Sequence, residues 1–215
     1  NKALSIAFCN NDDRCMLINK DGIAANRQEL LEMVLRWRVS KSDTYPEIKD
    51  YMAQHRFDDD ALELWDYYQS VIEWVKYLFA TYRKEMKNID WGTLYNKYHK
   101  NTYNPIELEK ELKRLFDLYD VDPDGLKKNG FYEYVLSGDR TLIWHRVFSD
   151  KQQRQAYANQ GKKCGGRCGR ELPFNELEAH HKVAFVNGGE TTVDNCLMLC
   201  HDCHADITAQ QNSSK

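Results

Sequence analysis

The residues most suited to chemistry lie near the end of the chain, where four cysteines form two close pairs. Cys164 and Cys168 are separated by three residues, Cys200 and Cys203 by two, and 31 residues lie between the pairs. Four thiolates at this spacing can bind one tetrahedral Zn²⁺, and such a closed site is structural. The alternative is a set of free cysteines. Cys196 lies in an apolar run and is predicted to be a small buried hydrophobic residue.

Polar residues that a purely structural zinc site does not need lie between and just after the two pairs. They are Glu178-Ala-His-His-Lys182, Asn187-Gly-Gly189, Asp194-Asn195 and His204. Neighbouring residues on a strand face opposite sides, so His180 and His181 are expected to point in different directions. The Asn-Gly-Gly turn should return the chain so that residues 195–199 lie beside residues 180–186. His204 then lies on a helix packed against this hairpin.

The order of these residues resembles the signature of the HNH endonucleases. The resemblance rests on Glu178-Ala-His-His, Gly188-Gly189, Asp194-Asn195 and Leu199-Cys200-x-x-Cys203-His204, with a lead-in from Phe148 to Gln160. It implies a ββα-metal fold bracketed by a four-cysteine zinc site. The implied activity is hydrolysis of DNA phosphodiester bonds with the help of a divalent metal.

The resemblance also assigns a role to each polar residue. His181 matches the general base that takes a proton from the water attacking phosphorus, and imidazole suits this role because its usual pKa is about 6.5. Asn195 matches the residue that orients this imidazole. His180 and His204 match the ligands of one Mg²⁺ or Mn²⁺, which neutralises the scissile phosphate. The implied products carry 5′-phosphate and 3′-hydroxyl ends.

Three positions depart from the family pattern. His180 stands where the family often has aspartate, and because imidazole is a softer ligand than carboxylate, Co²⁺ or Ni²⁺ can also serve as cofactor. Ala184 replaces a common proline, and Ile207 replaces a common lysine or arginine, so phosphate binding falls to another basic residue. The candidates are Lys182, Arg167, Arg170 and Arg154. Glu178 is either a partner of a metal ligand or a plain surface acid.

The residues before this segment have the apolar spacing of helices. Helices are expected in residues 24–38, 43–55, 60–86, 91–98, 104–116 and 131–136, and short strands in residues 1–20. Aromatic residues on the helical faces favour a packed core. Ser149 and Gln152 form a capping box that begins a further helix, ended by Gly161.

The expected fold is therefore α+β and mostly helical. A helical domain, residues 1–140, precedes a zinc-stapled ββα-metal HNH module, residues 141–215. The chain begins at Asn1 without methionine, and we expect it to be part of a longer protein. The upstream region loosely resembles the C-terminal part of bacterial restriction and phage-defence proteins that carry a ParB-like nucleotide-hydrolysing domain, which would be missing here.

The composition indicates the cellular compartment, and its net charge gives only weak support for DNA binding. The 215 residues carry a net charge of −3, and residues 140–215 contain ten basic and eight acidic residues. This asymmetry supports nucleic-acid contact only weakly, so DNA affinity must come from local patches or from another part of the protein. No apolar run is long enough to cross a membrane. Without a secretory signal, close cysteine pairs indicate a reducing bacterial cytoplasm.

Two functions are carried forward. The leading one is a metal-dependent DNA endonuclease in bacterial restriction or phage defence, acting on double-stranded DNA. The alternative is a zinc-stabilised DNA-binding module whose cleavage centre is decayed or dormant. A zinc deaminase is set aside, because its His-x-Glu and Pro-Cys-x-x-Cys elements are missing.

Overall fold

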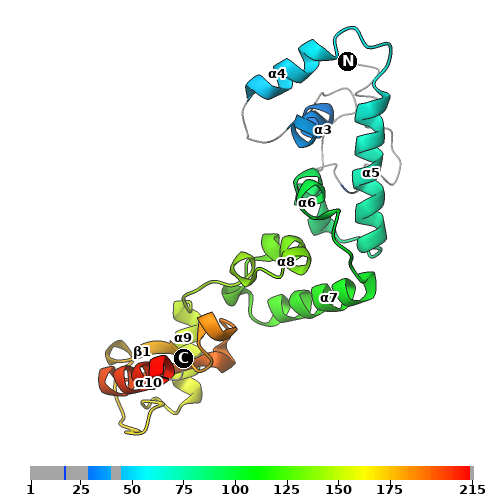
Figure 1. Cartoon of the computed structure of the whole chain (residues 1–215). Coiled ribbons are helices and arrows are strands. Elements are labelled where there is room, and N and C mark those ends of the chain that lie inside the picture. The colour runs from blue at the N-terminus through cyan, green and yellow to red at the C-terminus, as the bar shows by residue number, and fades with distance from the viewer. Residues whose placement is uncertain (1–16, 18–28, 40–44, 214–215) are drawn as a thin grey trace. The chain divides into compact units, whose positions relative to one another are not determined.

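The computed structural model describes Leu17 and residues 29–39 and 45–213 (Figure 1). The chain divides into two compact units, Asn1–Glu111 and Leu112–Lys215. The boundary expected at residue 140 falls inside the second unit. The strands expected in residues 1–20 lie outside the described residues, apart from Leu17.

The first unit is helical, as predicted. Its elements are α3 (Glu29–Val39), α4 (Tyr45–Gln54), α5 (Leu62–Leu78), the 3-10 helix η1 (Lys84–Asn88), α6 (Trp91–Tyr98) and the start of α7 (Pro105–Val121). Trp91 is fully buried, in keeping with a core role for its aromatic face. A Cβ atom added at Gly92 would lie 2.0 Å from Cγ of Trp37. Glycine on α6 therefore lets the Trp37 ring pack directly against that helix.

Helix α5 is shorter than its apolar pattern predicted. The pattern continued to residue 86, but the helix ends at Leu78 and Phe79 leaves it with φ −128° and ψ 72°. Phe79 is buried, and its ring centroid lies 5.6 Å from that of Trp91. Met86 is also buried, and its carbonyl accepts the indole N–H of Trp91. Packing around Trp91 therefore takes the chain out of the helix before its apolar pattern ends.

The second unit contains a small hairpin among helices. Its α-helices and strands after α7 are α8 (Phe131–Ser137), α9 (Asp150–Asn159), β1 (Glu178–His181), β2 (Cys196–Leu199) and α10 (His201–Ser213). Its 3-10 helices are η2 (Pro123–Gly125), η3 (Lys128–Gly130), η4 (Arg140–Leu142), η5 (Phe174–Glu176), η6 (Phe185–Asn187) and η7 (Val193–Asn195). The strands pair antiparallel, α9 packs against β2, and α10, red in Figure 1, contacts both strands. This confirms the mostly helical α+β class and the ββα unit.

Strand β1 also ends earlier than expected. The prediction extended it to residue 186, but the last pair of the ladder is His181 with Cys196. Beyond it, the N–H of Val183 donates to Oδ1 of Asn195 at 2.8 Å instead of to a strand. Gly188 then adopts φ 90°, a left-handed conformation that glycine tolerates without strain. The segment after His181 is therefore a loop tied to Asn195.

Helix α9 begins and ends as its sequence predicted. Ser149 and Gln152 form a reciprocal capping box, and Gly161 follows with φ 68°. Just before it, the side-chain amide of Gln160 accepts the N–H of Met198 at 2.8 Å and donates to its carbonyl at 3.0 Å. A side-chain amide thus bonds β2 as a neighbouring strand would. This pairing fixes α9 against the hairpin.

A single apolar cluster joins these elements to the cysteines. It contains Phe148, Ala156, Leu177, Met198 and Leu199 together with Cys164, Cys196, Cys200 and Cys203. Burial of Cys196 confirms its expected place in the core. Within the described residues, no helix is both long enough and apolar enough to span a bilayer.

Candidate functional site

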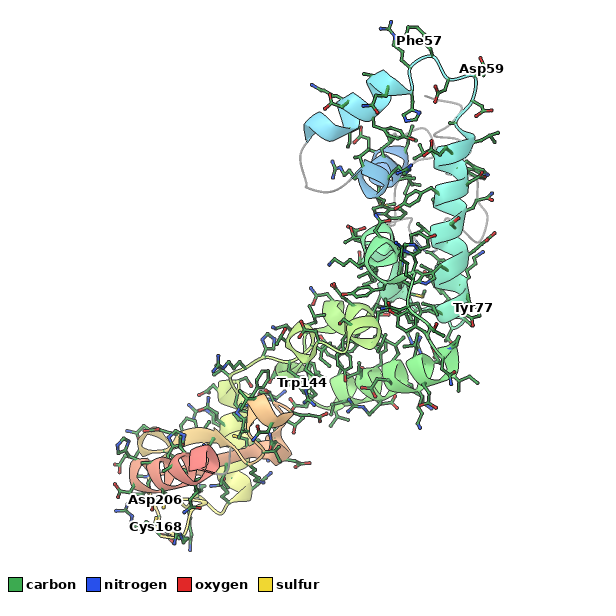
Figure 2. The ribbon with its side chains drawn as sticks, viewed as in Figure 1. Phe57, Asp59, Tyr77, Trp144, Cys168 and Asp206 are labelled. Atoms are coloured by element: carbon green, nitrogen blue, oxygen red, sulfur yellow. The ribbon has the colours of Figure 1, made fainter. Side chains whose placement is uncertain are left out.

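The four paired cysteines converge on one point. The sulfur atoms of Cys164, Cys168, Cys200 and Cys203 all lie within 4.8 Å of one another, and those of Cys168 and Cys200 are 3.7 Å apart. Four thiolates this close match the ligand set of a tetrahedral structural metal site. The prediction that the two pairs form one cluster is confirmed. Figure 2 shows Cys168 in a loop at the end of this unit, away from Trp144.

Hydrogen bonds favour the thiolate form that a metal requires at Cys168 and Cys200, whereas desolvation and the neighbouring thiols raise the pKa of Cys164 and Cys203. Bonds from Arg170, first from its backbone and then from its side chain, lower the pKa of Cys168 to about 6. The N–H of Cys200 also points at Sγ of Cys164, at 3.3 Å. A Cβ atom at Gly166 would lie 2.6 Å from Cβ of Cys203. Glycine is therefore needed for the first cysteine loop to approach the second.

A second group of polar side chains gathers between β1 and α10. His180 is 8% exposed, and its ring centroid lies 5.0 Å from that of His204, with the rings nearly perpendicular. Nδ1 of His204 lies 2.7 Å from Oε2 of Glu178, so Nε2 is the ring nitrogen that does not face this carboxylate. Glu178 and His180 are two residues apart on one strand and so share a face. A carboxylate beside one ring nitrogen is typical of histidines that bind a metal through the other nitrogen.

His181 lies in a different environment from His180. Its Nε2 is 3.2 Å from the hydroxyl of Thr191, and its ring centroid lies 4.1 Å from that of Phe148. Desolvation beside these groups, followed by the charge of His180, lowers the pKa of His181 below its usual value. An imidazole with a lowered pKa is neutral at neutral pH, as a general base must be.

Asn195 fixes the loop that carries His181. Its Oδ1 accepts the N–H of Val183 at 2.8 Å, and both hydrogens of Nδ2 go to backbone carbonyls, of Glu190 at 2.7 Å and Val183 at 3.1 Å. The direct side-chain bond to the imidazole, expected from Asn195, comes from Thr191. Asn195 closes the loop between the two strands.

Comparison with known proteins agrees with this geometry. Residues 164–210 match the family model described as HNH endonuclease. They form an HNH endonuclease domain. A region of the chain is 36% identical over 62 residues to a protein named type IV methyl-directed restriction enzyme EcoKMcrA, from Escherichia coli strain K12. That match covers 26% of this chain and 22% of the relative, so the chain spans only part of the relative's length. No solved structure matches the chain.

The four basic residues expected to bind phosphate lie in different surroundings on the HNH domain and the helix before it. Arg170 donates to Sγ of Cys200 and to Asp202, so it belongs to the cysteine cluster. Lys182 donates to the carbonyl of Asp194 at 2.6 Å. Arg154 pairs with Asp150 at 2.6 Å, and Arg167 is exposed. Lys182, next to His181 in sequence, is the candidate nearest to His180, His181 and His204 along the chain.

Three residues around His181 carried no signal as site residues in the sequence. Thr191 is an ordinary loop threonine by type, and His145 contributes only its backbone carbonyl. Gln152 was predicted as a helix cap, and it also donates to the carbonyl of Thr191 at 2.8 Å. Gln152 is 1% exposed, and most polar side chains buried to this degree are hydrogen-bonded. Only the folded structure reveals this burial.

Proposed function

We propose that this chain is a metal-dependent endonuclease that hydrolyses DNA phosphodiester bonds, in bacterial restriction or phage defence. The observation that carries the proposal is that three histidines of the HNH domain lie in two different environments. His180 and His204 face each other beside Glu178. His181 is held apart from them by Thr191 and Phe148.

His180 and His204 would hold the catalytic metal. Among the described residues, only the four cysteines form a cluster of three or more candidate ligands. Water and the DNA phosphate would therefore complete the coordination, as suits Mg²⁺ or Mn²⁺. When bound, this ion neutralises the scissile phosphate and the departing 3′-oxygen. Two imidazole ligands also suit Co²⁺ or Ni²⁺, while the four cysteines suit Zn²⁺.

His181 would act as the general base. Its neutral ring accepts a proton from a water molecule, whose oxygen bonds to phosphorus as the bond between phosphorus and the 3′-oxygen breaks. The departing 3′-oxygen takes a proton from a second water molecule, so the products are a 5′-phosphate and a 3′-hydroxyl. Asn195 supports this step indirectly, by holding the backbone of Val183 beside His181.

The alternative, a DNA-binding module without cleavage, has one observation in its favour. Ile207 packs against the apolar cluster at a position where the family commonly has a basic residue. Packing there removes a phosphate contact but leaves the three histidines in place. The arrangement of the histidines therefore favours the enzyme.

A plasmid assay separates the two functions. The zinc-loaded chain is incubated with methylated and unmethylated supercoiled plasmid and with Mg²⁺, Mn²⁺, Co²⁺ or Ni²⁺. We expect metal-dependent nicking or linearisation that is lost in His204→Ala and kept in His55→Ala. His55 is a matched control, since it pairs with Asp58 in the first unit. Binding of plasmid without cleavage by any metal would instead support the DNA-binding module.

A further inference from the structure

The loop before β2 contains one fully buried polar residue, Thr191. Its carbonyl accepts Nε2 of Gln152 at 2.8 Å. Its hydroxyl donates to the carbonyl of His145 and lies 3.2 Å from Nε2 of His181. Thr191 is thus the link between the ring of His181 and the backbone of the preceding loop.

The single hydrogen of the Thr191 hydroxyl decides which ring nitrogen of His181 carries a proton. A threonine hydroxyl has one hydrogen, and a carbonyl oxygen can only accept. Because Thr191 gives its hydrogen to His145, it can only accept from His181. Nε2 of His181 must therefore carry a hydrogen. In a neutral imidazole the other nitrogen, Nδ1, then holds the lone pair.

We propose that Thr191 is the positioning residue that fixes the tautomer of His181, with the proton on Nε2 and Nδ1 as the nitrogen that takes a proton from water. This inference rests on the proposed function only for the catalytic use of Nδ1. Without the hydroxyl, the bond that holds the proton on Nε2 is lost, and the fraction of rings with a lone pair on Nδ1 falls.

Residues upstream of the HNH domain hold Thr191 rigidly enough for this role. A Cβ atom at Gly125 would lie 1.9 Å from the carbonyl oxygen of Thr191, so the two backbones are in close contact. Gln152 also donates to Oδ2 of Asp122 at 2.9 Å and accepts the N–H of Ser149. Phe148 covers the face of the His181 ring. All these residues precede residue 164, so the matched family segment alone lacks them.

Nitrogen NMR of ¹⁵N-histidine-labelled chain tests the tautomer directly. Long-range ¹H–¹⁵N correlations distinguish the two neutral forms, and the spectrum of His181→Gln identifies the signals of His181. The zinc-loaded chain is studied without DNA or catalytic metal, at a pH where the ring is neutral. We expect the Nε2–H form in the wild type and in Thr191→Ser, and a mixture of forms in Thr191→Val. A wild-type ring in the Nδ1–H form would overturn the proposal, whether or not any variant folds.

Thr192→Val is the matched control, because it makes the same change one residue along, at a position that is not fully buried. It should leave the His181 spectrum unchanged. A spectrum of folded Thr191→Val identical to the wild type would also overturn the proposal.

Cleavage kinetics give the second readout. Thr191→Val should lower kcat by about 10–100-fold with little change in KM, and Thr191→Ser should restore most of the rate. Valine has the shape of threonine but also loses the bond to the carbonyl of His145, so the stability of Thr191→Val is measured beside its kcat and its His181 spectrum. The NMR result does not depend on activity. A chain with the Nε2–H form that cuts no DNA would support the inference on Thr191 and contradict the proposed function.

Discussion

At the residue scale, Glu178 pairs with two histidines, His201 and His204, and we propose that His204 binds metal. Its carboxylate lies 2.7 Å from Nδ1 of His204, and the bond to His201 is the first cause of its lowered pKa. Because an ionised carboxylate orients His204 and raises its basicity, Glu178→Gln should weaken Mn²⁺ binding by about 10–100-fold. Calorimetric titration of the zinc-loaded chain measures this change. Glu176→Gln, on the exposed η5, is the control, and equal affinity in both variants would refute the role of Glu178.

We expect protonation of His181 to set the pH dependence of cleavage. A base must be unprotonated, so activity is present above the pKa of the ring and is lost as pH falls through it. Desolvation and the charge of His180 lower that pKa. The acidic limb of kcat/KM at saturating Mn²⁺ should therefore lie below the usual histidine value of about 6.5. A limb above this value would mean that another group titrates.

The sequence predicted which acidic, histidine and cysteine residues lie close together better than it predicted the residues that contact them. His180, His181 and His204 stand at spacings fixed by a short hairpin and its helix, so local pattern is enough to select them. The partner of His181 is different, since Thr191 is itself held by His145, 46 residues away. Such a contact depends on the packing of the whole unit. For that reason the sequence pattern predicts Asn195, and not Thr191, as the residue that orients the imidazole of His181.

At the scale of elements, Gln160 connects helix α9 to the hairpin. Gln160→Ala removes both bonds to the backbone of Met198 and leaves its buried N–H without this partner. We expect a loss of about 1–3 kcal/mol in the free energy of unfolding of this unit. Denaturant titration, followed through release of the cysteine-bound metal, measures it.

Gln155→Ala is the control for Gln160→Ala. Gln155 is exposed on the same helix, and its side-chain amide donates to Oδ1 of Asn159. Its replacement should change stability by less than about 0.5 kcal/mol. Equal losses in the two variants would show that the bonds to β2 contribute nothing.

Element boundaries were predicted well where the chain carries its own end signals. The capping box of Ser149 and Gln152 placed the start of α9 correctly. Helix α5 and strand β1 lack such signals and were predicted too long. Their ends are set by distant side chains, the packing of Phe79 on Trp91 and the bond of Val183 to Asn195.

At the scale of the whole molecule, the bound metal should decide whether the HNH domain folds. Cys203→Ala removes one of four thiolates, and metal-binding energy is folding energy in such small sites. Hydrogen exchange should rise across residues 164–210 while α5 and α6 stay protected. Cys196→Ala, also at a buried cysteine but outside the cluster, should keep its metal and its protection. Unchanged exchange in Cys203→Ala would mean that the domain does not need the metal.

The HNH domain is a small part of the described chain, and its neighbours contribute to the site. The family match begins at residue 164, yet Asp122, His145 and Gln152 support Thr191 from earlier in the chain. The composition of the chain gave no hint of this, because these are single polar residues in helical or loop sequence. The expected relation of the first 140 residues to proteins with a nucleotide-hydrolysing domain stays a prediction.

Single-turnover cleavage by His181→Ala tests the central claim most directly. The rate is measured on an end-labelled duplex with saturating Mn²⁺, together with zinc content and Mn²⁺ affinity. Loss of a general base should slow cleavage by about 10²–10⁴-fold while the zinc content and the Mn²⁺ affinity stay near those of the wild type. Wild-type products should carry 5′-phosphate and 3′-hydroxyl ends. Cleavage by His181→Ala at the wild-type rate would contradict the assignment of His181 as the base.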